Sequence, residues 1–340
     1  MVSTTAFKGS SSGEIVEALI PRKPLDGSQV LIEIHAAGFC GTDLHYTHQD
    51  MVLGHEGAGV VVELGPKVKH LKVINSGDRV GFGWSHDSCG RCDNCLVGEG
   101  GHCLEKMHSF GLTELDQGGF STYAIWEEEF LYTLPDAMSF TDAAPMMCAG
   151  MTVFTPLVRY GVKATDRVGV VGIGALGHLA IQFASKMGCE VIAFSGSDSK
   201  REEALKLGAT KFVVTRGDDK IDLKDLGGRL NHLFVTTSVL PSWEKYIDIM
   251  AVYGTIYPLT VSDGDATFPF LPFLLKDLSF SASTGGSKLI FKQMFEFAVR
   301  HNVKPMIEKF PFNLDGIKEA EKKMNEGKLR YKAVLTVIDD

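Results

Sequence analysis

The chain has 340 residues, more than one hydrophobic core usually organises, and this length favours two domains. Hydrophobic residues make up 44% of the chain and charged residues 22%, which is typical of a folded globular protein and excludes a disordered one. With 34 basic and 42 acidic residues the formal net charge is −8, so we expect neither a nucleic-acid surface nor a polybasic membrane patch. The first residues lack the pattern of a secretion signal, and the most apolar stretch, 168–184, is too short to span a membrane. We therefore expect a soluble, cytoplasmic protein with no membrane partner.

The first 150 residues show short β-type runs at 30–34, 59–64 and 79–82, separated by glycine and proline, which predicts a β-rich region. Three possible metal ligands are scattered through it: Cys40 in GFCGTDLH, His55 in LGHEGAGVV and Cys148 in PMMCAGMT. Two thiolates and an imidazole leave the fourth position of a zinc ion open, as catalytic sites do. Each residue alone is equally consistent with ordinary packing in a core.

Four cysteines lie close together in CGRCDNCLVGEGGHC, with the spacing C-x2-C-x2-C-x7-C. A thiolate at every third position lets one loop wrap a single ion, and four thiolates suit a closed, structural Zn²⁺ site. The alternative is a loop of free or redox-active thiols. We predict a structural zinc bound by Cys89, Cys92, Cys95 and Cys103, and we expect the remaining Cys189 to be a core residue.

The middle of the chain carries a nucleotide-binding pattern. The apolar run 168–171 leads into Gly172-Ile-Gly174-Ala-Leu-Gly177, and apolar residues at helical spacing follow it. A G-x-G-x-x-G between a strand and a helix is typical of a site for a dinucleotide pyrophosphate. Further strands are predicted at 190–194, 212–215, 232–236, 255–257 and 278–282, with a helix at 200–207. This alternation predicts a parallel, doubly wound sheet.

The end of the second strand of this region indicates which cofactor binds. An acidic residue there would bind the ribose 2′-hydroxyl of NAD, but this chain has Ser195-Gly196-Ser197, followed by Lys200 and Arg201. Hydroxyls and two cations suit a 2′-phosphate, so we predict NADP(H). In the alternative interpretation, the two cations only form a solvated helix face beside Asp198 and Glu202.

Taken together, these motifs resemble the zinc-dependent medium-chain alcohol dehydrogenases, especially the NADP-linked branch that includes the cinnamyl alcohol dehydrogenases. The match runs in order through CGTDLH, GHEGAGVV, the four-cysteine segment, GGFSTYA, MMCAGMT, GIGALGHLA and LRYKAV. The resemblance implies an α/β protein with a GroES-like, β-rich catalytic domain from residues 1–150 and 286–340. A Rossmann NADP-binding domain would be formed by residues 151–285, and the cofactor would lie between the two domains.

The resemblance also assigns roles near the metal. Cys40, His55 and Cys148 would hold a catalytic zinc, which with the structural ion makes two Zn²⁺ per chain. Glu56 would be a neighbour that can approach or bind the ion. Thr42, the nicotinamide ribose and His45 would relay a proton, and Asp43 would accept a hydrogen bond from His55.

Other residues would bind cofactor and substrate. Tyr46, Trp84 and Phe110 would line an apolar substrate pocket, although each could equally belong to the core. The cofactor contacts implied beyond those above are Ala175, Leu176, Thr236, Thr284, Gly286 and Arg330. The reaction expected is hydride transfer between NADP(H) and an alcohol, with an aldehyde or ketone as the other partner.

One departure and several alternatives remain. Only residues 41–54 separate Cys40 from His55, fewer than in many family members, and this segment borders the substrate entrance, so the substrate class does not carry over. The same fold could reduce iminium ions or activated alkenes, or the zinc segment could serve a protein without enzyme activity as an interaction module. The resemblance implies a homodimer or homotetramer, formed through the sheet edge around residues 278–282.

Overall fold

The structure is a computed structural model that describes residues 3–216, 220–262 and 264–337. The chain divides into two compact units. Unit 1 takes in the residues up to Cys148, Gly286–Arg300 and the residues from Pro305 onward, and unit 2 consists of Ala149–Gly285 and His301–Lys304.

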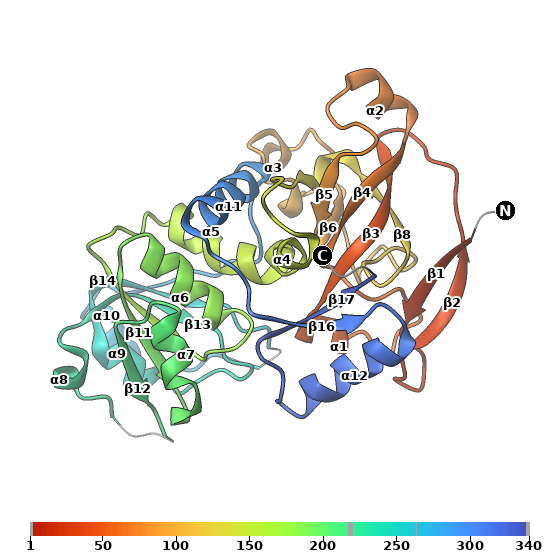
Figure 1. Ribbon diagram of the computed structural model, residues 1–340. Helices are drawn as coiled ribbons and strands as arrows, with labels where there is room; N and C mark the ends of the chain where they lie inside the picture. Colours follow the sequence, from red (N-terminus) through yellow and green to blue (C-terminus); the bar gives the residue numbers. More distant parts are fainter. Residues whose placement is uncertain (1–2, 217–219, 263, 338–340) are drawn as a thin grey trace. The chain divides into compact units, whose positions relative to one another are not determined.

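Unit 1 is built on a seven-stranded sheet whose main path runs β16-β17-β3-β4-β5-β9. The long strand β3 (Gln29–Phe39) pairs along its length with β4 (Gly57–Leu64) and, through its first residues, with β8 (Tyr123–Glu127). Its last residues pair with β17 (Lys332–Thr336), where Ala333 lies opposite Phe39. Figure 1 shows this C-terminal strand, in blue, beside β3, in red. The C-terminal segment is therefore part of the same sheet as the residues just before Cys40.

Smaller elements complete unit 1, whose core holds large buried side chains such as Phe39, Phe82 and Trp126. The further strands are β1 (Ser3–Lys8), β2 (Val16–Pro21), β5 (Arg79–Phe82), β6 (Ser85–Asp87), β7 (His108–Ser109), β9 (Leu131–Thr133) and β16 (Ile307–Pro311). The helices are α1 (Gly41–Leu44), α2 (Pro66–Leu71), α3 (Asp93–Leu96), α4 (Phe140–Pro145), α11 (Lys288–His301) and α12 (Leu314–Asn325).

Unit 2 contains a six-stranded sheet in the order β12-β11-β10-β13-β14-β15, and every pair in it is parallel. Numbered from β10, this is the order 3-2-1-4-5-6 of a Rossmann fold. The strands are β10 (Arg167–Val171), β11 (Glu190–Ser195), β12 (Lys211–Val214), β13 (Leu230–Val235), β14 (Met250–Pro258) and β15 (Ser279–Phe280). The helices are α5 (Met151–Arg159), α6 (Gly177–Lys186), α7 (Arg201–Lys206), α8 (Leu223–Leu226), α9 (Trp243–Ile249) and α10 (Phe270–Leu274). The predicted doubly wound sheet is confirmed.

Helix α6 packs against the three central strands β10, β11 and β13. Its residues 177–184 are buried almost without interruption, because the helix crosses the middle of the sheet. None of the helices in the described part of the chain is long and apolar enough to cross a membrane.

Candidate metal and cofactor sites

Four side chains of unit 1 converge at the edge of its sheet. The thiols of Cys40 and Cys148, the imidazole of His55 and the carboxylate of Glu56 each offer one ligand atom, and these atoms all lie within 4.8 Å of one another. Cys40 follows β3 directly, and His55 and Glu56 precede β4. Because β3 and β4 are paired, with Ala37 opposite Gly57, donors that are distant in sequence meet here.

Cys148 is brought to this group by an unusual turn. Helix α4 ends at Pro145, and residues Met146–Gly150 continue as a π-helix. Such single π turns are rare and occur often at functional sites. The turn lies close to β5, because a β-carbon at Gly81 would lie 2.5 Å from the Met147 sulfur and one at Gly83 would lie 3.0 Å from the Met147 carbonyl oxygen.

Asp43 holds two members of the group in place. It lies in α1 and is fully buried. Its Oδ2 accepts a hydrogen bond from the Cys40 amide at 2.9 Å, and its Oδ1 accepts one from the Gly54 amide at 3.1 Å. Oδ1 also lies 3.0 Å from His55 Nδ1, which leaves Nε2 as the imidazole atom available to a metal.

Glu56 forms a buried ion pair with Lys332, a residue 276 positions later in the chain. Lys332 Nζ lies 2.5 Å from Glu56 Oε1, and both residues are at most 1% exposed. Oε2 is buried without a hydrogen-bond partner, and a β-carbon at Gly38 would overlap it. Burial raises the pKa of Glu56 to about 8, although Lys332 opposes this change.

Sequence reasoning missed Lys332. A lysine among apolar residues at the start of strand KAVLT was a usable signal, because a charged side chain is rarely buried without a partner. The register of β17 on β3 places it next to the position of Cys40. The lysine thus adds a positive charge beside a group that contains two thiols, an imidazole and one carboxylate.

The electrostatics of the two thiols favour a cation. A hydrogen bond from Cys148 lowers the pKa of Cys40 well below its usual value. The same contact, together with burial, raises the pKa of Cys148 well above it. The two sulfurs therefore share one negative charge readily, and a cation would favour the ionisation of both. Two thiolates and an imidazole are the ligands of a three-ligand zinc site, so the donor set fits this ion.

The predicted proton-relay residues lie on or beside α1. Thr42 Oγ1 is 3.7 Å from the Cys40 sulfur. His45 is exposed at the end of the helix.

Two aromatic residues lie beside the metal group: the rings of Trp84 and Phe110 lie 5.8 and 5.2 Å from the His55 ring. Trp84 is partly exposed, whereas Phe110 is fully buried, so Phe110 can support a pocket wall but offers no surface of its own.

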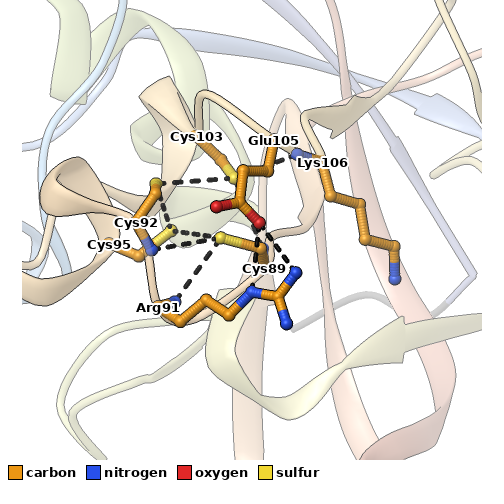
Figure 2. A network of polar contacts seen from close by, with 7 residues as sticks. All are labelled: Cys89, Arg91, Cys92, Cys95, Cys103, Glu105 and Lys106. Carbon is orange, nitrogen blue, oxygen red and sulfur yellow. Dashed lines mark hydrogen bonds and ion pairs between the residues drawn. The ribbon is translucent and has the colours of Figure 1, made fainter.

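The four clustered cysteines form a second group around α3. Figure 2 shows their sulfur atoms converging on one point. The Cys89–Cys95, Cys92–Cys95 and Cys92–Cys103 sulfur separations are 3.9, 3.5 and 3.9 Å. Four sulfurs about 2.3 Å from a tetrahedral zinc would be about 3.8 Å apart, so the geometry fits the ion.

Backbone amides donate hydrogen bonds to the sulfur atoms of this loop and favour their ionised form. The Cys89 and Lys106 amides lie 3.3 and 3.2 Å from the Cys103 sulfur. Although desolvation opposes ionisation, these hydrogen bonds lower the pKa of Cys103 to about 6. Outside the sulfurs, Arg91 donates two hydrogen bonds to Glu105 at 3.0 and 2.9 Å and links the two ends of the loop (Figure 2).

The glycine-rich turn of unit 2 has the geometry that a pyrophosphate needs. Gly172 has a φ of +87°, and a β-carbon at Gly177 would overlap the Gly172 carbonyl oxygen, so both positions require glycine. Gly174 faces open space, which leaves room for a ligand against the backbone. Thr236 donates hydrogen bonds to the Val171 and Gly172 carbonyls at 2.9 and 2.8 Å, so its hydroxyl braces the turn. Ala175 and Leu176 complete the turn before α6 begins.

The two predicted phosphate-binding cations differ in their surroundings. Lys200 Nζ donates to the Ile173 carbonyl at 2.6 Å, which places the ammonium beside the glycine-rich turn. Arg201 instead pairs with Asp198 at 2.6 Å and lies over the Phe212 ring. Ser195 ends β11, and its Oγ accepts a hydrogen bond from the Ser197 amide across Gly196. Lys200 is thus the better placed of the two cations.

The remaining predicted cofactor residues lie elsewhere. Thr284 lies one residue before the end of the Ala149–Gly285 segment of unit 2, and Gly286 opens the segment of unit 1 that leads into α11. Arg330 is exposed before β17, and its amide donates to Glu308 Oε1 at 2.6 Å. Their roles toward a cofactor stay predictions.

Two family models match the chain. Residues 26–136 match the alcohol dehydrogenase GroES-like domain, and residues 175–300 match the zinc-binding dehydrogenase domain. A probable formaldehyde dehydrogenase of Bacillus subtilis is 33% identical, with 94% of this chain and 93% of that protein covered. An aldehyde reductase of Synechocystis is 34% identical, with 92% of each covered.

Solved structures agree with these matches. A cinnamyl alcohol dehydrogenase from Sorghum bicolor has a TM-score of 0.88 and 26% identity, with 98% of this chain and 97% of that one covered. The corresponding Helicobacter pylori enzyme, described as complexed with NADP(H), has a TM-score of 0.87 and 25% identity, with 98% of each chain covered. The chain therefore belongs to the zinc-dependent medium-chain alcohol dehydrogenase family, in the branch that includes the cinnamyl alcohol dehydrogenases.

Proposed function

We propose that the protein is an NADP-dependent zinc alcohol dehydrogenase that interconverts an alcohol and the corresponding aldehyde or ketone. The observation that carries the proposal is the convergence of Cys40, His55, Glu56 and Cys148 in a chain that also has a dinucleotide-binding turn. When bound, zinc supplies a Lewis acid for the substrate oxygen, and the nicotinamide supplies or accepts the hydride.

The residues around the donors have separate tasks. Asp43 fixes the Cys40 backbone and the His55 ring, so the donors are held in place before any ion binds. We assign the Thr42 hydroxyl, which lies near the Cys40 sulfur, to take the proton of a substrate hydroxyl while it passes its own proton on toward the nicotinamide ribose and His45. His45 is exposed, so its imidazole can pass a proton on to water.

The choice of NADP(H) rests on the chemistry at the end of β11. No carboxylate stands at positions 195–197, and Lys200 lies beside the turn where the phosphates would bind. An ammonium group attracts the additional 2′-phosphate, whereas a carboxylate would repel it. The Helicobacter pylori relative with bound NADP(H) supports the same choice.

Two further features complete the proposal. We assign two zinc ions per chain, one to the group around Cys40 and a structural one to the four cysteines. We also propose that two copies associate through β15, the open edge strand of the parallel sheet in unit 2.

The test combines activity with metal content. The zinc-loaded enzyme should oxidise NADPH only with an aldehyde or ketone and form one alcohol per NADPH, and it should contain two zinc ions. C148S should lose more than about 99% of this activity and retain one zinc ion, because a three-ligand site loses an essential thiolate. C189S changes a buried thiol outside both groups and should keep both ions and full activity.

Other results would identify other functions. NADPH oxidation with an iminium or activated-alkene substrate but not with any carbonyl compound would make the protein a different reductase. A single zinc ion and no binding of NADPH would support an interaction module. Full activity of C148S would overturn the assignment of the catalytic metal.

A further inference from the structure

Tyr46 is held between two glycines that come from different parts of unit 1. Its main chain packs against Gly9, which lies just after β1, and its ring packs against Gly111, which lies just after β7. Neither glycine belongs to the motifs that identify the family.

The contact at Gly9 involves three carbonyl groups. A β-carbon at this position would lie 2.5 Å from the Gln49 oxygen and 2.6 Å from the oxygens of Thr47 and Tyr46. Real β-carbons do not approach backbone so closely, and the backbone here has little freedom to move away. Substitution of Gly9 therefore displaces the chain that carries Tyr46.

Hydrogen bonds join the same two segments. The Ser10 amide donates to the Thr47 carbonyl at 2.8 Å, and the Gly9 amide donates to the Met51 carbonyl at 3.0 Å. Lys8 also pairs with Asp50 at 2.6 Å. The short segment between Cys40 and His55 is thus supported by the last residue of β1 and the two residues that follow it.

The contact at Gly111 involves the ring itself. A β-carbon there would lie 2.5 Å from Tyr46 Cε1 and Cζ and 2.9 Å from the hydroxyl oxygen. Gly111 also has a φ of +74°, which disfavours other residues. Beside it, Phe110 meets the Tyr46 ring edge to face, with centroids 5.5 Å apart.

Tyr46 lies one side chain away from the candidate metal ligands. Its ring is 6.3 Å from Trp84, and both Trp84 and Phe110 lie next to His55. Tyr46 and Trp84 are partly exposed, so each offers an apolar ring surface beside the metal group. A substrate whose oxygen meets the ion would extend its non-reacting end over such a surface.

We propose that Gly9 and Gly111 are positioning residues that fix Tyr46 from two sides, and that Tyr46 determines how well the enzyme accepts substrates with a bulky apolar group. This inference rests on the proposed alcohol dehydrogenase function. Neither the two glycines nor Tyr46 contacts the reacting atoms. We therefore expect their substitution to change how the enzyme binds the end of the substrate that lies far from the metal.

The first test measures specificity with zinc-loaded enzyme, using benzaldehyde and acetaldehyde with NADPH. Y46A should lower the ratio of kcat/KM for benzaldehyde to that for acetaldehyde by about tenfold, chiefly through KM, since it removes contact with the ring but no reacting group. G9A and G111A should lower the ratio by about threefold or more. The zinc content and the pH profile of kcat should stay unchanged.

Matched glycine variants control for backbone effects. Gly161 has a φ of +66°, and a β-carbon at this position would meet no other atom within 4 Å. G161A therefore introduces the same backbone strain as G111A but no contact with a neighbouring side chain. G264A serves for G9A, because a β-carbon at Gly264 meets only Ser262 Oγ at 3.4 Å. An unchanged ratio in Y46A, or equal changes in the test and control variants, would overturn the proposal.

The second test does not require activity. In protein labelled with 3-fluorotyrosine, the ¹⁹F resonance of Tyr46 is assigned from its loss in Y46F. G9A and G111A should shift this resonance, and G161A and G264A should not. If the parent protein reduces no aldehyde, the proposed function is wrong, and so is the proposed role of Tyr46 in substrate specificity. The shifts of the ¹⁹F resonance would still show whether the two glycines position the Tyr46 ring. A resonance that neither G9A nor G111A moves would overturn the positioning role.

Discussion

The buried pair of Glu56 and Lys332 shows how single residues balance charge beside the candidate catalytic metal. Removing a carboxylate and an ammonium group from water costs several kcal/mol for each, and their attraction offsets this cost only while both are present. The pair lies next to thiols that must ionise to bind zinc. Lys332 therefore stabilises the negative charge of Glu56 and of both thiolates in a place where water does not.

At the residue scale, we expect K332M to destabilise unit 1 by about 3–5 kcal/mol above pH 8, where the Glu56 carboxyl group ionises, because the substitution leaves that charge buried without a partner. K332R keeps the positive charge and should lose much less. The free energy of unfolding in urea measures both effects. The double variant K332M/E56Q should recover part of the loss, since it removes both charges, and equal stability of K332M and the parent protein would contradict this account.

Sequence reasoning found the donors and, through the resemblance, Asp43, but not Lys332. Cys40, His55 and Cys148 stand in motifs whose residue types point to a metal, and the four-cysteine spacing indicates its own geometry. The apolar strand that follows Lys332 indicates that the lysine has a buried partner, but neither Lys332 nor Gly9 has a local pattern that identifies its partner, because the partners lie in other segments and the contacts depend on how β17 and β1 fold back. Phe110 was expected either to line the substrate pocket or to belong to the core, and it is fully buried beside the rings of Trp84 and Tyr46.

At the scale of elements, the loop that carries the four cysteines has little other structure to keep it folded. Helix α3 has four residues, none of them buried. Most of the apolar side chains around it, including Leu96, Val97 and Leu104, are exposed. Such a segment has no core of its own, so its conformation would depend on an ion held by the four thiols.

We therefore expect C95S to remove one zinc ion per chain and to lower the midpoint of thermal unfolding by roughly 5–10 °C. Zinc content by atomic absorption and calorimetry of the same preparation provide the measurement. C189S, which alters a thiol that donates to the Lys163 carbonyl, is the matched control and should keep two ions. A C95S protein with two ions would show that the loop does not bind zinc as proposed.

The regular elements were the most predictable part of the fold. The glycine-rich turn and the strands around it follow a local pattern of apolar residues and glycine, and the structure has them near the expected positions. Their ends were less predictable. The strand expected at 255–257 extends over Met250–Pro258, and the one expected at 278–282 shortens to Ser279–Phe280, because pairing with neighbouring strands decides where each strand ends.

At the scale of the whole molecule, β15 leaves one edge of the unit 2 sheet unpaired within the described chain. Exposed edge strands readily pair with another chain unless they are covered. Apolar residues are exposed nearby: Leu271 on α10 and Leu275 just after it are 62% and 72% exposed, and Tyr253 on β14 is 77% exposed. The Tyr253 amide donates to the Lys276 carbonyl at 2.8 Å, which joins these residues into one surface.

If two copies of the chain are related by a two-fold axis beside β15, their β15 strands can pair with each other. The exposed apolar surface of each copy then packs against the same surface of the other copy. We expect light scattering to give at least twice the 37.0 kDa mass of one chain. L275E places a charge in the centre of this contact and should shift the protein toward the monomer by about tenfold or more in dissociation constant. The control L205E, on α7 near the opposite edge of the sheet, should leave the mass unchanged. A parent protein that is monomeric at micromolar concentration, or an L275E dimer as tight as the parent, would place the interface elsewhere.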